Sequence, residues 1–288
     1  MGASSLGNLA EDRYFLPFRR GGDRGTAQRV VVLFFSGYDQ DMPIRVTTTI
    51  KALAIIYFAV FLIVQTSDQF FGTDLTGILA LVPARVVGHL WFWQLFTYSF
   101  LHADVLHLFL NLLMLVFVGS DLSSIWGRWA FIRYYVFCCF ASGLLYLCLQ
   151  VFLAGGLEIP MVGASGGIYG LLIAFGLVFS ERQMAFMMMF PMRAKHFIWV
   201  LAVIEFMVMI YSPGSSRFSA VAHLGGMMAG FLYLWGLAVL RVRARNIKAR
   251  IDSGKTKQKG HLKLVVNRDD RKSYDDDDEA GGGPKTWH

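Results

Sequence analysis

The chain has 288 residues, of which 55% are apolar and only 16% are charged, and its mean hydropathy is +0.49. Soluble domains typically carry about 25% charged residues. The composition therefore disfavours a soluble enzyme, a disordered protein and a nucleic-acid-binding protein, and it indicates a polytopic membrane protein.

The net charge of +7 is concentrated at the two ends of the chain. Residues 1–51 hold seven Lys or Arg against five Asp or Glu, residues 52–240 hold seven of each, and residues 241–288 hold thirteen against eight. Basic segments beside an apolar block bind anionic lipid headgroups more often than nucleic acid. We therefore expect lipid, and no nucleic acid, among the partners.

Charge-poor stretches along the chain are long enough to cross a membrane, which takes about 20 largely apolar residues. Six such helices are predicted, at residues 49–67, 104–120, 132–153, 164–181, 196–212 and 220–240. The sequence thus predicts an all-α membrane protein built as a bundle of six transmembrane helices.

Lys and Arg are enriched on the cytoplasmic side of membrane proteins, which sets the orientation. Six spans place both ends on one side, and the ends carry most of the Lys and Arg. We expect a multi-pass integral protein of a prokaryotic plasma membrane with both termini cytoplasmic. It divides into a cytoplasmic N-terminal segment (1–46), a six-helix domain (47–240) and a basic, largely disordered cytoplasmic tail (241–288). The tail is expected to begin as a helical stem that contacts anionic lipids.

The first outer loop, residues 68–103, is long and mostly apolar. Trp91 and Trp93 lie close together in it, and such rings favour the membrane interface. We expect this loop to be a structured element that lies at the interface.

The second predicted helix carries polar side chains on one face. His107 and Asn111 are four residues apart and so share a face, and His102 precedes them. Polar groups within a span are costly and usually face the bundle interior. They serve either as interhelical hydrogen-bonding groups or as parts of a site.

The fourth predicted helix opens on Gly163-Ala164-Ser165-Gly166. Backbone N–H groups in a first helical turn have no intrahelical partner and form a site for negative charge. Ser165 there can attack a carbonyl while its own N–H helps to hold the oxyanion. The alternative is a capping serine among glycines that allow close packing.

The sixth predicted helix carries His223 on the same face as two glycines. Two small-xxx-small seams with equal spacing, which let backbones approach closely, lie in the fourth and sixth helices. The seams are formed by Gly166 and Gly170 and by Gly226 and Gly230. Packing them together would bring His223 toward Ser165, with Tyr169 against the imidazole. The alternative is a histidine that bridges helices.

The depth of these groups favours a catalytic interpretation. At about 1.5 Å per residue, Asn111, Ser165 and His223 fall within roughly 3–12 Å of the outer ends of their helices. A serine nucleophile needs a base within hydrogen-bond reach, and a neutral histidine supplies it. No Asp or Glu has an obvious line to His223, so the sequence predicts a Ser–His dyad with Asn111, His107 and the Ser165 N–H as oxyanion donors.

Three motifs thus occur in order on the second, fourth and sixth predicted helices. They are His102-x4-His107-x3-Asn111, Gly163-Ala164-Ser165-Gly166, and His223 followed by Gly226 and Gly230. Together, over residues 47–240, they resemble the rhomboid family of intramembrane serine proteases. The chain departs from the family's pattern at Gln94, where many members have Arg after Trp93, and at Asp121, where Glu is frequent.

The resemblance implies a rhomboid-like bundle in which Ser165 is the nucleophile and His223 the general base. It implies His107 and Asn111 as oxyanion-side residues, and Gly163 and Tyr169 are candidate supporting residues. The implied reaction is hydrolysis of peptide bonds in or near the transmembrane segments of single-span membrane-protein substrates. No metal and no organic cofactor is expected.

Two other functions remain open at this stage. A catalytically inactive rhomboid-like protein would bind membrane clients, although such relatives usually lack the Ser or the His. A small transporter would show paired ionisable groups at the midplane, and Glu205 is the one candidate, without an evident partner. Zinc and aspartyl intramembrane protease motifs are missing from the sequence. A metal cluster of His102, His107 and His223 is conceivable.

Overall fold

The computed structural model describes residues 46–154, 156–186, 190–212 and 214–259. The expected N-terminal segment, apart from residue 46, and the part of the tail expected to be disordered lie outside these residues. The α-helices outside residues 72–104 are α2 (Thr48–Phe71), α6 (Val105–Met114), α7 (Ser120–Trp126), α8 (Arg128–Leu149), α9 (Ser165–Val178), α10 (Ala194–Tyr211) and α11 (Ser215–Lys259).

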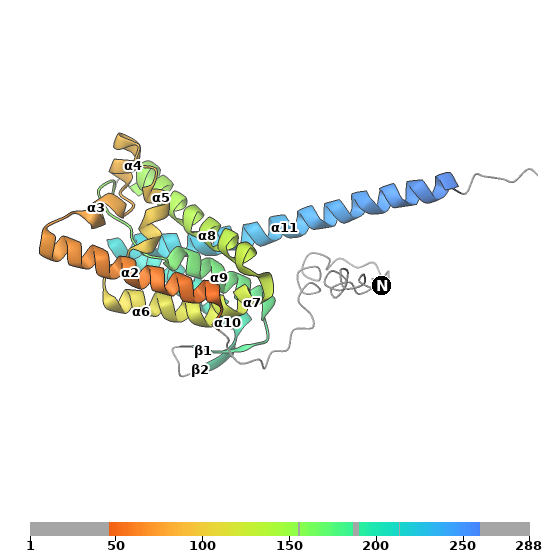
Figure 1. The fold of residues 1–288 in the computed structure, drawn as a ribbon, viewed down its shortest axis with the longest axis horizontal. Coiled ribbons are helices and arrows are strands. Elements are labelled where there is room, and N and C mark those ends of the chain that lie inside the picture. The colour runs from red at the N-terminus through yellow and green to blue at the C-terminus, as the bar shows by residue number, and fades with distance from the viewer. Residues whose placement is uncertain (1–45, 155, 187–189, 213, 260–288) are drawn as a thin grey trace, which may run out of the picture. The chain divides into compact units, whose positions relative to one another are not determined.

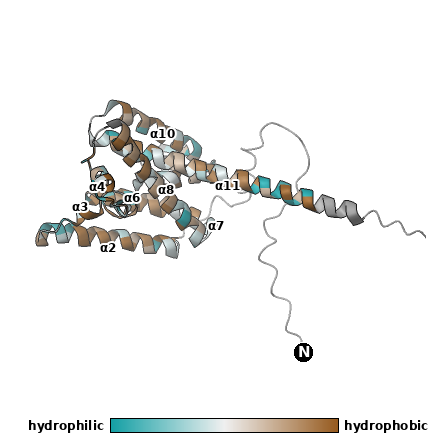
Figure 2. Cartoon of the chain, turned by 90° about the horizontal axis from the view of Figure 1, so that it is seen from above, coloured by the Kyte–Doolittle hydropathy of each residue, from teal (hydrophilic) through white to brown (hydrophobic). Residues whose placement is uncertain are grey.

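The protein is an all-α membrane bundle (Figure 1). Five helical segments are long and apolar enough to cross a membrane: Thr48–Phe71, Val105–Trp126, Arg128–Phe152, Ala194–Tyr211 and Ser216–Ile251. The second of these joins α6 and α7 through a π-helical turn, η3 (Leu115–Gly119), and a second π-helical turn, η4 (Gln150–Ala154), follows α8. The sixth expected span is the shorter helix α9, which has 14 residues. The helices of the bundle are largely hydrophobic in Figure 2.

Side-chain caps and a glycine fix where two of the helices begin and end. Thr47 accepts a hydrogen bond from the Ile50 N–H at the start of α2, and Gly72 ends that helix at φ 64°, a left-handed conformation that suits glycine. Asp104 caps α6 by accepting a 2.8 Å hydrogen bond from the His107 N–H. The start of α6, and with it the position of His107, is therefore fixed by a local contact.

The segment between α2 and α6 folds into short helices: α3 (Leu75–Leu79), α4 (Pro83–His89), α5 (Gln94–Thr97) and the 3-10 turn η2 (Tyr98–Phe100). Gln94 holds it together from a fully buried position. Its side chain accepts from the Val82 N–H at 3.0 Å and donates to the carbonyls of Gly77 and Ile78. A bridge between Leu81 and Met161 ties the segment to the chain that leads into α9.

The connection between α9 and α10 contains a β-hairpin, which the sequence pattern does not predict. Strands β1 (Gln183–Phe186) and β2 (Phe190–Arg193) pair antiparallel, with Gln183 opposite Arg193. Next to it, Arg182 forms a 2.6 Å ion pair with Asp121 of α7, both partly buried. A four-residue strand is too short for the sequence pattern to reveal against its apolar surroundings.

The described chain comprises one compact unit that ends at Leu240 and a second that begins at Arg241. Helix α11 continues across this boundary to Lys259. Beyond it the helix presents exposed basic side chains, namely Arg241, Arg243, Arg245, Lys248 and Arg250.

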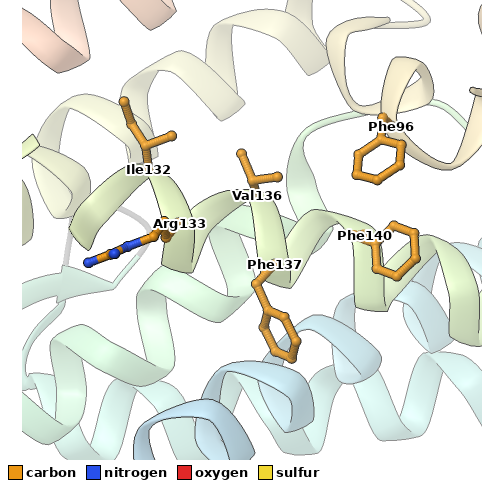
Figure 3. A pocket seen from close by; sticks show the side chains of 6 residues that line it. All are labelled: Phe96, Ile132, Arg133, Val136, Phe137 and Phe140. Atoms are coloured by element: carbon orange, nitrogen blue, oxygen red, sulfur yellow. The ribbon is translucent and has the colours of Figure 1, made fainter. Parts of the chain in front are cut away.

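Two hollows in the bundle lie away from the residues singled out on α9 and α11. One, of about 370 Å³, is a shallow groove along α8 lined by Phe96, Ile132, Arg133, Val136, Phe137 and Phe140 (Figure 3). The other, of about 310 Å³, is lined by Gln65, His102 and Pro160 among others. Neither includes Ser165 or His223 in its lining.

Candidate active site

Ser165 is the first residue of α9, which begins one residue after the start predicted for the fourth helix. The chain enters the helix through Gly163, whose φ of 121° strains any residue with a side chain. A Cβ at Gly163 would also lie 2.8 Å from Cε1 of His107. The glycine thus lets the imidazole of His107 approach the backbone that leads to Ser165.

The glycines of α9 and α11 bring these two helices into backbone contact. A Cβ at Gly226 would overlap the carbonyl oxygen of Gly166 and lie 2.7 Å from its carbonyl carbon. A Cβ at Gly230 would lie 3.1 Å from Cα of Gly170. The structure therefore packs the two glycine seams against each other.

Two hydrogen bonds from α8 hold this pair of helices. The Tyr134 hydroxyl donates to the carbonyl of Gly170, and the Ser142 hydroxyl donates to the carbonyl of Ala222, each at 2.7 Å. One accepting carbonyl belongs to α9 and the other to α11, so the neighbouring helix α8 anchors both helices.

The close packing places the side chains of Ser165 and His223 together. Nε2 of His223 lies 2.8 Å from Oγ of Ser165, a hydrogen-bond distance, and both residues are partly buried. The ring of Tyr169, one turn along α9, stacks on the imidazole with 4.2 Å between centroids and 5° between planes. The Ser165 hydroxyl, the His223 imidazole and the Tyr169 ring thus lie together, the arrangement that the glycine spacing predicts.

The expectation that His223 has no acidic neighbour is wrong. Oε1 of Glu205, on α10, lies 3.1 Å from Nδ1 of His223 and accepts a hydrogen bond from the Tyr169 hydroxyl. Nδ1 is near the carboxylate in distance but does not make a hydrogen bond of good angle. Glu205, interpreted from sequence as an acid without a partner, therefore lies beside His223. Ser165, His223 and Glu205 form a continuous series of side-chain contacts, called the Ser–His–Glu row below.

The depth of Glu205 was a signal that sequence reasoning missed. Glu205 lies six residues before the end of α10 and His223 eight residues after the start of α11. At about 1.5 Å per residue these offsets are about 9 and 12 Å, so the two groups lie at similar distances from those helix ends. The same depth argument that joined Ser165 and His223 would have included Glu205.

The polar residues of α6 include one, His107, that lies beside the chain leading into Ser165. His107 contacts the Gly163 backbone, as described above, and its ring meets that of His102 edge-on at 5.2 Å between centroids. Asn111 is buried, and its Nδ2 has no hydrogen-bond partner among the described residues. A buried amide donor of this kind can hydrogen-bond to a bound substrate.

The acidic, histidine and cysteine side chains do not gather into a metal site within the described part of the chain. No group of three or more of them there is arranged to hold a metal ion. His102 and His107 lie together, whereas His223 pairs with Ser165 and Glu205.

Residues 89–239, just over half of the chain, match the Rhomboid domain family. The chain belongs to the rhomboid family. Rhomboid protein 1, mitochondrial, of Saccharomyces cerevisiae is 29% identical over 153 residues, which cover 52% of this chain and 44% of the yeast protein. RHOMBOID-like protein 1 of Arabidopsis thaliana is 33% identical over 141 residues, covering 49% of this chain and 33% of that protein.

One of the relatives is named as inactive. Inactive rhomboid-related protein 2 of Caenorhabditis elegans is 28% identical over 193 residues, covering 63% of this chain and 51% of the relative. The chain spans about half or less of the length of these rhomboid relatives. Membership of the rhomboid family therefore establishes the fold and the membrane location, while the activity has to be argued from the site.

Proposed function

We propose that this protein is an intramembrane serine endopeptidase that hydrolyses peptide bonds in or near the transmembrane segments of single-span membrane proteins. The observation that carries the proposal is the 2.8 Å approach of His223 Nε2 to Ser165 Oγ inside a bundle of apolar helices. A hydroxyl and an imidazole at this distance can act as the nucleophile and the base of acyl transfer.

In the proposed reaction, Ser165 Oγ attacks the carbonyl carbon of the scissile peptide bond while Nε2 of His223 takes the hydroxyl proton. The tetrahedral intermediate collapses when His223 gives that proton to the leaving amine, which leaves an acyl ester on Ser165. Water then attacks the ester carbonyl while Nε2 of His223 takes a proton from it. His223 returns that proton to Ser165 Oγ as the ester C–O bond breaks, which releases the new carboxyl end of the substrate and restores the serine.

The oxyanion needs fixed hydrogen-bond donors. Ser165 lies in the first turn of α9, where N–H groups lack intrahelical partners. Nδ2 of Asn111 is buried and unpartnered among the described residues, and the ring of His107 lies against Gly163. We assign these three groups to the oxyanion.

We further propose that both termini lie in the cytoplasm, that the membrane is a prokaryotic plasma membrane, and that the basic stem after Leu240 contacts anionic lipids. The high share of Lys and Arg in the two ends supports this orientation. Reporter fusions to each end in a bacterial host test the topology, and a signal from the outer side at either end would contradict it.

The decisive experiment compares the purified protein with Ser165→Ala and His223→Ala variants on a model single-span substrate and on a fluorophosphonate probe. Both variants should lose at least about 1,000-fold in rate, because nucleophile and base act as a unit. Ser180→Ala and His196→Ala are matched controls, since neither residue contacts the proposed site. Full activity in Ser165→Ala would refute the assignment.

A pull-down assay added to this experiment tests the alternative function, client binding without catalysis. An inactive, client-binding protein would retain the single-span substrate in pull-down assays without cleaving it, and its Ser165 would not react with the probe. The C. elegans relative, named as inactive, makes this a specific alternative.

A further inference from the structure

Glu205 takes no part in the proposed Ser–His chemistry as written above, yet it lies beside the base. We propose that Glu205 is a positioning residue that holds His223 in the tautomer with its proton on Nδ1, so that Nε2 is free to accept the Ser165 proton. This inference rests on the proposed protease function and deepens it, because it turns the expected dyad into a row of three groups.

Three helices contribute to this row. Oε1 of Glu205, from α10, accepts a hydrogen bond from the hydroxyl of Tyr169, from α9, and lies 3.1 Å from Nδ1 of His223, from α11. The phenol and the imidazole lie parallel and in contact, so both rings direct a polar atom to the same oxygen. One carboxylate oxygen therefore sets the position of the ring stack as well as of the imidazole edge.

The burial of Glu205 requires an explanation. The residue is only 8% exposed and lies within a helix of membrane-spanning length. A buried carboxyl is costly unless it is paired and hydrogen-bonded, and the structure gives it both a hydroxyl donor and an imidazole.

The chemistry follows from the single proton of a neutral imidazole. A carboxylate beside Nδ1 favours the proton on that nitrogen, which leaves the lone pair of Nε2 directed at the Ser165 hydroxyl 2.8 Å away. When Nε2 takes the serine proton, the carboxylate stabilises the resulting imidazolium. The present angle at Nδ1 is poor, and such contacts commonly tighten when substrate binds.

The other groups that face His223 cannot supply this function. Ser165 occupies Nε2, Tyr169 offers its ring face, and His107 of α6 is close enough to interact electrostatically but carries no negative charge. Among these neighbours, Glu205 is the one whose side chain carries a negative charge when it is ionised.

The test compares wild type with Glu205→Gln, which removes the charge and keeps the shape, and Glu205→Leu, which also removes the acceptor. Glu181→Gln is the matched control, because that carboxyl is exposed and pairs with Arg193 and Lys195 near the hairpin. We expect kcat to fall roughly ten- to one-hundredfold in both Glu205 variants with KM within about twofold. The acid limb of the pH–rate profile should move to lower pH, because the protonated imidazole loses its anion.

A merely structural bridge would lower the thermal stability of the Glu205 variants without moving the acid limb. An unchanged kcat and acid limb, with Ser165 still labelled by a fluorophosphonate, would overturn the inference and leave the proposed function standing.

Nitrogen-15 spectra of the His223 ring, assigned by comparison with His223→Ala, show which ring nitrogen carries the proton, and they do so without an activity measurement. We expect the proton on Nδ1 in wild type and a mixture of tautomers in Glu205→Leu. If wild type neither cleaves nor labels, the protease proposal fails, and these spectra still support or overturn the positioning. A wild-type proton on Nε2 would overturn it. If Glu205→Leu does not fold, the pH–rate profile and the nitrogen-15 spectrum are both measured on Glu205→Gln.

Discussion

Gly226→Ala is a sharp test of the packing that creates the site, because it adds one methyl group where two backbones touch. The new Cβ would lie 2.7 Å from the carbonyl carbon of Gly166 and overlap its oxygen, whereas ordinary contact begins at 3.4 Å. Neither atom is the flexible end of a side chain, so α9 and α11 must separate by about 1 Å. If this shift reaches the site, the 2.8 Å between Ser165 Oγ and His223 Nε2 becomes about 3.8 Å, beyond hydrogen-bond distance.

We expect Gly226→Ala to lower the rate of Ser165 labelling by a fluorophosphonate about 100-fold and to destabilise the fold by roughly 1–3 kcal/mol. The control is Gly236→Ala on the same helix, where a Cβ would meet nothing within 4 Å. Alanine there should leave the rate unchanged and stabilise the helix by up to about 1 kcal/mol. A Gly226→Ala variant that labels and cleaves at the wild-type rate would refute the link between the glycine seam and the catalytic distance.

Two further predictions concern the segment before α6. Gln94→Leu should lower the unfolding free energy by roughly 1–3 kcal/mol, because it leaves the buried Val82 N–H without its acceptor. The carbonyls of Gly77 and Ile78 keep the side chains of Arg85 and Trp93 as donors. Thermal unfolding measured beside the exposed control Gln183→Leu checks this, and equal melting temperatures would contradict it. Burial, and then nearby His107, lowers the pKa of His102 from 6.5 to about 4. The unfolded chain therefore binds a proton at His102 more readily than the folded protein does. The free energy of unfolding is highest above pH 6.5, where His102 is neutral in both states, and it decreases as the pH falls toward 4. Between pH 7 and pH 5, the free energy of unfolding of wild type should fall by up to about 2 kcal/mol more than that of His102→Gln. Unfolding free energies that change in parallel with pH in the two proteins would disprove the argument.

The apolar composition and the spacing of polar residues predicted much of this protein. Apolar stretches long enough to span a membrane located the helices, because lipid leaves the backbone few alternatives to a helix. The equal four-residue spacing of the glycines in α9 and α11 predicted that Ser165 and His223 would meet, and the structure brings them together. The hairpin between α9 and α10 and the buried role of Gln94 were not predicted, since both depend on contacts with neighbouring segments.

Local sequence thus determined where the helices run and which face of each carries polar groups, because helical periodicity depends only on spacing along the chain. Only the tertiary structure decided that Glu205 faces His223. That contact joins two helices through a carboxylate, and the rotation of α10 about its own axis is set by packing against its neighbours. An acid that looked isolated in the sequence gained its partner through that rotation.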